Sequence, residues 1–183
     1  SNFIENYKPD LLIVVGDRFE LFSICISSLI YNVPIAHIHG GEITYGLIDD
    51  YVRHSITKMS SIHFVSNKIY KKRIVQMGEN PNSVVCCGSP SIDLIKKINF
   101  CNKNTLKNLL KIDLLDKIFV VTYNPITTSK FITLKEISNL LKALGNFKNC
   151  SIIFTLPNYD YNSDIISKKI KLFCKRKKNF NFF

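Results

Sequence analysis

Residues 34–59, PIAHIHGGEITYGLIDDYVRHSITKM, contain the three local patterns from which the fold can be predicted. Pro34–Ile38 is a short, mainly apolar segment of the length of a strand. A loop with three glycines follows it, and Asp49 and Asp50 then begin a helix that extends to about Met59. Glycines let the backbone turn sharply and approach a ligand closely. The stretch therefore predicts a strand, a functional loop and a helix in succession.

The same succession recurs along the chain. Leu11–Val15 is wholly apolar, as is typical of a parallel strand covered on both faces. Further strands are predicted at residues 62–65, 83–87, 118–122, 152–155 and 180–183, and further helices at 19–31, 67–77, 92–98, 106–110, 134–144 and 164–175. Repeated βα units imply right-handed crossovers and parallel sheets. We predict an α/β protein with two doubly wound, Rossmann-like halves.

A polar stretch at Asn99–Asn104 is the predicted boundary between these halves. We expect one domain at residues 1–98 and another at residues 99–183. Ligands of open α/β sheets bind outside the carboxyl ends of the strands, so a crevice is expected there.

Composition excludes several classes of protein. The hydrophobic content of 46% is ordinary for a globular chain, and no apolar run approaches the roughly 20 residues of a membrane span. Ser1–Asn6 has neither a basic nor an apolar leader segment, so no signal peptide and a cytoplasmic location are expected. The chain does not start with methionine, and we expect it to be a piece of a longer protein.

The net charge of +11 is confined to the second half of the chain. Residues 1–89 hold eight basic and eight acidic side chains, whereas residues 90–183 hold seventeen basic and six acidic ones. The lysines are scattered over predicted helix surfaces and are not interleaved with stacking aromatics, as a nucleic-acid surface would require. A solvated, lysine-rich surface is the preferred interpretation, and neither nucleic acid nor a membrane is an expected partner.

The six cysteines form no C-x-x-C pair and no metal-binding spacing. We expect them to be small buried hydrophobic residues in a reducing compartment, and we expect no metal site.

Candidate functional residues follow the first two strands. Asp17 and Arg18 come directly after Leu11–Val15, although Asp17 could instead cap the next helix and pair with Arg18. His37 and His39 share one face of their strand because side chains alternate. We favour a functional role for His39, which adjoins the glycine pair, and a hydrogen-bonded core role for His37.

The loop and the helix after it supply the remaining titratable groups. Glu42 lies in the glycine loop as a candidate base or hydroxyl acceptor. Asp49, Asp50, Arg53 and His54 occupy one helical turn, where spacings of three and four place them side by side. The alternative is that the aspartates interact with the positive helix N-terminus and form surface ion pairs.

A second loop, Gly88–Ser91, precedes a predicted helix and could offer backbone N–H groups to a phosphate. This signal is weak by itself, since Ser-Pro is also an ordinary helix start.

Four motifs in order, GDRFE at 16–20, HIHGGE at 37–42, DD-x-x-RH-x-x-TK at 49–58 and GSPSID at 88–93, resemble the hydrolysing UDP-N-acetylglucosamine 2-epimerases. The resemblance extends through nearly the whole chain and is nearest to the enzymes that make precursors of sialic and legionaminic acids. It implies two Rossmann-like domains in a glycosyltransferase-B arrangement, both incomplete here. Residues 1–98 would be the C-terminal half of the first domain, and residues 99–183 the N-terminal half of the second.

The resemblance also implies a reaction: elimination of UDP through a glycal, then hydration to the 2-epimeric free sugar. It requires no cofactor, and a homo-oligomer is expected at full length. By match to the motifs, Asp17 and Asp49 are the leading acid and base candidates, with Glu42 third. Substrate-binding roles are expected for Arg18, His39, Asp50, Arg53, His54, Gly88, Ser89 and Asn124.

Two positions depart from the family pattern. Some relatives have a catalytic glutamate where His39 stands, so His39 could take that role or transfer it to Glu42. Asn124 replaces a histidine that contacts the nucleotide in relatives, and asparagine carries no proton for acid catalysis. The residues given are not expected to complete the site by themselves. A non-catalytic sugar-nucleotide-binding remnant and a glycosyl transferase of similar fold are the alternatives.

Overall fold

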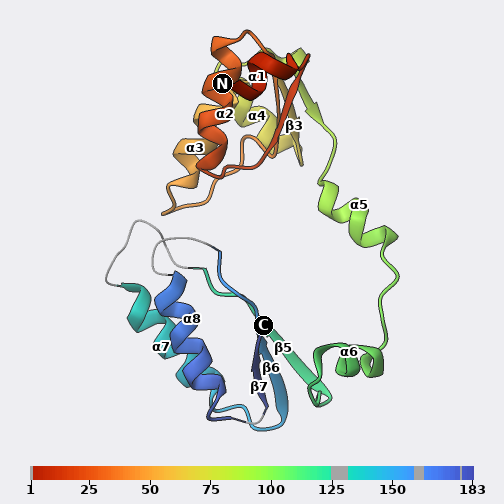
Figure 1. Cartoon of the computed structure of the whole chain (residues 1–183), viewed down its shortest axis with the longest axis vertical. Helices are drawn as coiled ribbons and strands as arrows, with labels where there is room; N and C mark the ends of the chain where they lie inside the picture. Colours follow the sequence, from red (N-terminus) through yellow and green to blue (C-terminus); the bar gives the residue numbers. More distant parts are fainter. Residues whose placement is uncertain (1, 125–131, 159–162, 178) are drawn as a thin grey trace. The chain divides into compact units, whose positions relative to one another are not determined.

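Two parallel sheets organise the chain, one of four strands and one of three. The computed structural model describes residues 2–124, 132–158, 163–177 and 179–183. The sheets belong to separate compact units, residues 1–98 and residues 99–183 (Figure 1). The predicted α/β class with two Rossmann-like parallel sheets is confirmed.

The first sheet has the strand order β1-β2-β3-β4, which is also the order in the sequence. Its strands are β1 Leu12–Val15, β2 Ile35–Ile38, β3 Ile62–Val65 and β4 Val84–Cys86; its helices are α1 Asn2–Tyr7, α2 Glu20–Ile30, α3 Asp49–Met59, α4 Lys68–Gln76 and α5 Pro90–Lys97, with the short 3₁₀ helix η1 at Pro81–Ser83. Helix α4 begins at a capping residue, since the Asn67 side chain accepts from Ile69 and Tyr70, whereas α2, α3 and α5 have no side-chain capping hydrogen bond.

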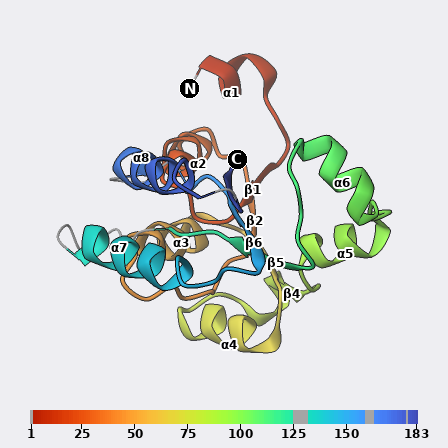
Figure 2. The same ribbon diagram turned by 90° about the horizontal axis from the view of Figure 1, so that it is seen from below.

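Sequential strand order explains where the helices of this unit lie. When parallel strands are added in one direction through right-handed crossovers, the crossover helices all fall on the same face of the sheet. In agreement, α2 packs on β1 and α3, α3 on β2, and α4 on β3 and β4 (Figure 2). The prediction that β1 is covered on both faces is therefore wrong: Val14 is buried, but Ile13 and Val15 are 59% and 57% exposed.

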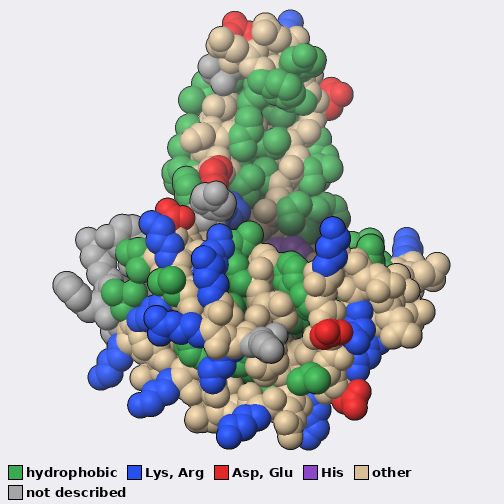
Figure 3. All heavy atoms as spheres, turned by 60° about the horizontal axis from the view of Figure 1, so that its bottom comes forward, with side chains coloured by type: hydrophobic (Ala, Val, Ile, Leu, Met, Phe, Trp, Pro, Cys, Tyr) green, Lys and Arg blue, Asp and Glu red, His purple; other side chains and the backbone are tan. Residues whose placement is uncertain are grey.

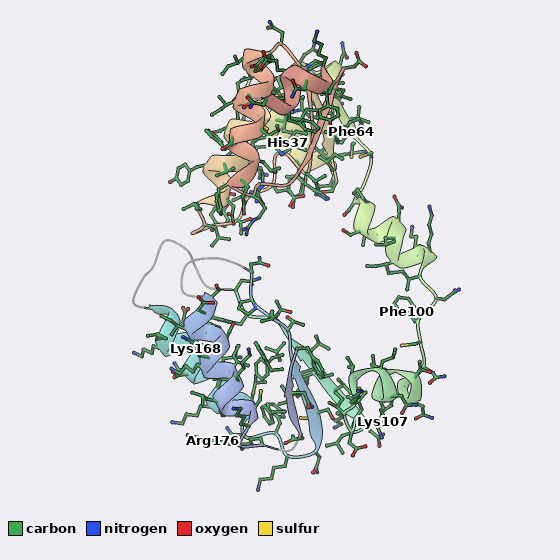
Figure 4. All side chains as sticks on the ribbon, in the orientation of Figure 1. His37, Phe64, Phe100, Lys107, Lys168 and Arg176 are labelled. Carbon is green, nitrogen blue, oxygen red and sulfur yellow. The ribbon has the colours of Figure 1, made fainter. Side chains whose placement is uncertain are left out.

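The core of the first unit lies between the sheet and these helices. Val14 and Ile35 from the strands pack with Cys25 of α2 and Ile56 of α3. His37 belongs to the same interior, as Figure 4 shows, and is fully buried. Its Nε2–H donates to the Gly16 carbonyl oxygen at 2.8 Å. The predicted core role of His37 is confirmed.

The second unit has the strand order β5-β6-β7. Its elements are α6 Lys103–Leu110, β5 Lys117–Val121, α7 Ile132–Leu144, β6 Cys150–Phe154, α8 Ser163–Cys174 and β7 Phe180–Phe182. Every residue of the central strand β6 is buried. Its side chains Ile152 and Phe154 pack with Ile166 and Ile170 of α8 and with Phe180 of β7. Here too α7 and α8 lie side by side along one face of the sheet (Figure 1).

The cysteines follow the prediction only in part. Cys25 and Cys150 are buried, but Cys86, Cys87 and Cys101 are exposed. Cys86 ends the edge strand β4, where only the first residue is buried, Cys87 follows it, and Cys101 lies between α5 and α6. The expectation that all six are buried is wrong because three of them stand outside both cores.

On the face shown in Figure 3, basic side chains are scattered over the second unit among other side chains. Figure 4 labels three of them: Lys107 on α6, Lys168 on α8, and Arg176 in the turn after α8. No helix in the described ranges is long and apolar enough to cross a bilayer.

Acidification should destabilise the first unit through His37. Burial is the main cause that lowers the pKa of His37 from 6.5 to about 4. The unfolded chain then binds the proton more readily, so the stability from neutral His37 is complete above pH 6.5 and is lost as pH falls toward 4. We expect a loss of about 2 kcal/mol in unfolding free energy between pH 7 and pH 5 from this residue.

Urea unfolding of wild type and His37→Gln, followed by circular dichroism at both pH values, measures this contribution. Glutamine can donate to Gly16 but does not titrate. Burial also lowers the pKa of His54 and His63, so the wild type has other sources of acid sensitivity. The difference between the two proteins is the readout, and identical pH dependence would contradict the assignment.

Candidate functional site

The loops that leave the first sheet gather at its carboxyl edge. Gly16 and His39, the residues after β1 and β2, donate their backbone N–H groups to Ile38 and Phe64 of the next strand. The residue after β4 does the same to β3. These bonds bring the starts of the loops to one level, which is where ligands bind in open α/β sheets.

Arg53 of α3 is the centre of this edge. Its side chain is only 3% exposed. Its Nη2 atom pairs with the Asp17 carboxylate and donates to Thr44 Oγ1 at 3.1 Å. Its Nη1 atom donates to Asp50 Oδ1 at 2.5 Å and to the Glu42 carbonyl oxygen at 2.9 Å. One guanidinium therefore joins the β1 loop, the glycine loop and α3.

Two alternatives drawn from the sequence are wrong. Asp50 and Arg53 do not form a surface ion pair, since the guanidinium is buried. Asp17 does not cap α2, whose N-cap residue is Phe19 with no side-chain hydrogen bond. Arg18 forms its ion pair with Glu20, at 3.0 Å. Asp17 is thus held across the fold and not by its neighbours in the sequence.

His39 and Glu42 form a second pair within the glycine loop. His39 Nδ1 lies 3.0 Å from Glu42 Oε1, and the two side chains are 24% and 31% exposed. The Ser66 hydroxyl, which follows β3, donates to the same carboxylate oxygen at 3.5 Å. His39 also has a left-handed backbone, with φ of 68°. A non-glycine residue in this region is uncommon and clusters at functional sites.

Close packing explains the two glycines that follow. A Cβ atom on Gly41 would lie 2.6 Å from the Tyr70 carbonyl oxygen, and φ there is +77°. A Cβ atom on Gly40 would lie 3.0 Å from His37 Nδ1. Position 41 therefore requires glycine, whereas a side chain at position 40 would make tight contacts with the side chains around it.

His54 lies on a different side of α3 from its neighbour Arg53. It lines a pocket of about 780 Å³ together with Tyr45, Asp50 and Tyr51. Burial lowers the pKa of His54, and Asp50 acts in the opposite direction. Of the predicted residues, the edge thus brings together Asp17, His39, Glu42, Asp50 and Arg53, and His54 lies beside this group in the pocket that Asp50 also lines.

Asp49 stays a candidate acid or base because of its position. It is partly buried and immediately precedes Asp50 in the first turn of α3.

Gly88 and Ser89 follow β4 at the same edge of the sheet. Gly88 has a positive φ of 86°, and Ser89 precedes α5 with no side-chain capping hydrogen bond. Pro90 occupies the first turn of the helix. This arrangement leaves both interpretations of the Gly88–Ser91 loop in place.

Asn124 belongs to the other unit, just after β5. Its Oδ1 atom accepts the backbone N–H of Asn158 at 3.0 Å, which ties together the loops after β5 and β6. Asn124 thus lies at the carboxyl edge of the second sheet, as Asp17 does at that of the first.

Sequence reasoning missed three residues that shape the site. Thr44 and Ser66 bind Arg53 and Glu42 through their hydroxyls. Arg73 of α4 donates to the Gly41 carbonyl oxygen and lies over the Tyr70 ring. Only Ser66 carried a usable signal, because it directly follows a strand. Within the described residues, no cluster of three or more His, Cys, Asp or Glu side chains could hold a metal ion.

Comparison with known proteins places this site in a family. The sequence model of the UDP-N-acetylglucosamine 2-epimerase family matches residues 1–182. The chain belongs to the UDP-N-acetylglucosamine 2-epimerase family. This confirms the resemblance drawn from the four motifs.

Individual relatives match over about half of their own length. The chain is 43% identical over 176 residues to the GDP/UDP-N,N'-diacetylbacillosamine 2-epimerase (hydrolyzing) of Campylobacter jejuni, covering 96% of this chain and 46% of that protein. It is 43% identical over 179 residues to polysialic acid biosynthesis protein P7 of Escherichia coli, covering 97% and 46%. The UDP-GlcNAc 2-epimerase of Neisseria meningitidis bound to UDP-GlcNAc has a similar fold, with a TM-score of 0.78 at 20% identity over 100% of this chain and 51% of that one.

Removing the buried guanidinium should weaken this 2-epimerase fold. Arg53→Met keeps the apolar stem but leaves Asp17 and Asp50, which are 27% and 22% exposed, without their cation. We expect a loss of about 3 kcal/mol in unfolding free energy, measured by urea titration. Arg18→Ala is the control, because its ion pair with Glu20 is exposed to solvent and should contribute much less to stability. Equal losses in the two variants would remove Arg53 from its central role.

Proposed function

We propose that the protein carrying this chain is a hydrolysing 2-epimerase that acts on UDP-N-acetylglucosamine or a 2,4-diacetamido-trideoxy UDP-sugar. The observation that carries the proposal is the Arg53 cluster, which holds Asp17, Asp50 and the glycine loop together at the carboxyl edge of the sheet. The printed names of the Campylobacter jejuni and Legionella pneumophila relatives, both hydrolysing 2-epimerases of diacetylbacillosamine nucleotides, support it.

The proposed reaction has two steps. A base removes the proton at sugar C2, the C–H electron pair becomes the C1=C2 bond of a glycal, and the C1–O bond breaks with its electrons leaving on UDP. Water then adds at C1 while a proton returns to C2 from the opposite face. The products are UDP and the free 2-epimeric sugar, and no cofactor takes part.

Each candidate residue has a place in this proposal. Asp17 and Asp49 are the leading acid and base, since proton transfer needs carboxylates at the reacting edge. Arg53 and Asp50 set the geometry, and Arg18 and His54 contribute to substrate binding. Gly88 and Ser89 follow β4 and could offer donors to the diphosphate, and Asn124, which follows β5, is a proposed substrate-binding residue of its own unit.

The setting of the reaction belongs to the same proposal. Residues 1–98 would form the second half of a first Rossmann-like domain, and residues 99–183 the first half of a second. The product would feed sialic or legionaminic acid synthesis in the cytoplasm, and the enzyme would be a homo-oligomer.

Asn124 favours one alternative, a sugar-nucleotide-binding protein without catalysis. Its amide binds Asn158 and has no titratable proton. Calorimetry with each UDP-sugar, beside an assay of UDP release, separates the two. Turnover supports the epimerase, and binding without turnover supports the alternative.

Loss of either leading carboxylate should stop turnover. In the protein at its full encoded length, Asp17→Asn and Asp49→Asn should each lower the rate of UDP release by about 10²–10⁴-fold, because amides cannot exchange the proton. Asp10→Asn is the matched control: this exposed residue precedes β1, whereas Asp17 follows it. Near-normal rates in either site variant, with folding checked by circular dichroism, would strike that residue from the mechanism.

A further inference from the structure

The His39–Glu42 pair is built as a proton-transfer unit. The carboxylate of Glu42 accepts from His39 Nδ1 at 3.0 Å and from Ser66 at 3.5 Å. A carboxylate that can only accept fixes the histidine tautomer with hydrogen on Nδ1, so the lone pair is on Nε2. The ring therefore presents a base at Nε2, while Glu42 can stabilise the positive charge that forms when this base takes up a proton.

The backbone shows that this orientation is built into the loop. His39 has a φ of 68°, in a region that costs a non-glycine residue of order 1–3 kcal/mol. On its C-terminal side, Gly41 is packed too closely against the Tyr70 backbone to accept a Cβ atom, and a Cβ atom on Gly40 would make tight contacts. On its N-terminal side, the His39 N–H group is bonded to Phe64. The loop thus retains a strained histidine at the sheet edge where glycine would cost less.

The other histidines of the chain differ from this pattern. His37 and His63 are fully buried inside the first unit. His54 lines a pocket together with Asp50, and its Nδ1 atom is buried without a hydrogen-bond partner in the part of the chain that the structure describes. His39 alone among the four combines partial exposure at the strand ends with a carboxylate on Nδ1.

The aspartates of the site have a different role from that of Glu42. Asp17 Oδ2 and Asp50 Oδ1 are both engaged by the buried guanidinium of Arg53. These carboxylates fix the loops in place, and each has one oxygen committed to that task. Glu42 contributes to the same cluster only through its backbone carbonyl, so its side chain is left to the histidine.

We infer that His39 is a catalytic residue that removes the proton from sugar C2, and that Glu42 is its positioning residue. This inference rests on the proposed function and changes its order of candidates. Nε2 takes the C2 proton, the C–H electron pair forms the C1=C2 bond, and the C1–O bond breaks to release UDP. His39 returns its proton to solvent, because the proton that inverts C2 arrives from the other face.

The left-handed backbone makes a clean test possible. Glycine adopts a φ of 68° without strain, so His39→Gly should leave the midpoint temperature of thermal unfolding unchanged or slightly raised. It should nevertheless lower kcat for UDP release by about 10²–10⁴-fold. Added imidazole should then raise the kcat of this variant at least tenfold, because it can occupy the space that the histidine ring has left. His39→Asn, which also tolerates this backbone, should be equally inactive but should not be rescued.

Glu42 is tested through the same assay. Glu42→Gln should lower kcat by about 10–100-fold with little change in KM, because the substrate is not its partner. In the His39→Gly background the same change should have almost no further effect, since both residues act as one unit. Glu5→Gln is the matched control, with an effect below about threefold, because Glu5 is an exposed residue of α1 that precedes β1.

The outcomes separate the two proposals. A wild-type protein that releases no UDP from either sugar nucleotide overturns the proposed function. An active wild type with near-normal His39→Gly, or with additive losses for His39 and Glu42, overturns only the assignment made here. Inactivity of His39→Gly without imidazole rescue, together with lowered thermal stability, would mark a structural role and also overturn it.

Discussion

The first unit depends on a single buried cation. Arg53 is contributed by α3, yet its partners come from the β1 loop, the glycine loop and its own first helical turn. A guanidinium can satisfy so many acceptors because its N–H groups are fixed in one plane. Burying it without those acceptors would be very costly, so the loops must close around it when the unit folds. The same contacts that stabilise the fold thereby set the geometry of the candidate site.

Local patterns in the sequence predicted most of the framework. The apolar runs gave the strands to within a residue or two, and Asp49 and Asp50 marked the start of α3 correctly. The Asp50–Arg53 pair follows from helical spacing. By contrast, the Asp17–Arg53 pair joins residues 36 positions apart, and no periodicity indicates it. The burial of the Arg53 guanidinium also could not be predicted from the sequence, because burial depends on how three loops pack.

In the glycine loop, too, the sequence indicated the candidate residues but not their geometry. Its composition pointed to function, and the adjoining histidine and glutamate were both selected as candidates. What the sequence could not show is that His39 takes a left-handed backbone and turns Nδ1 toward Glu42. That geometry arises from the close approach of Gly41 to α4, a contact between distant segments. The predicted roles of Asp17, Glu42 and Asp49 in catalysis stay predictions.

One-sided helix packing has a practical consequence. The strands of the first sheet are added in one direction, so the crossover helices cover only one of its faces. On the other face, Ile13 and Val15 of β1 are more than half exposed. Within the described residues, β1 pairs with β2 alone, so its outer edge has backbone groups open to another strand. Apolar edges of this kind invite strand addition between molecules. Residues 1–183 produced by themselves should therefore self-associate as concentration rises, and a charged residue facing outward at position 13 would be the first change to keep them in solution.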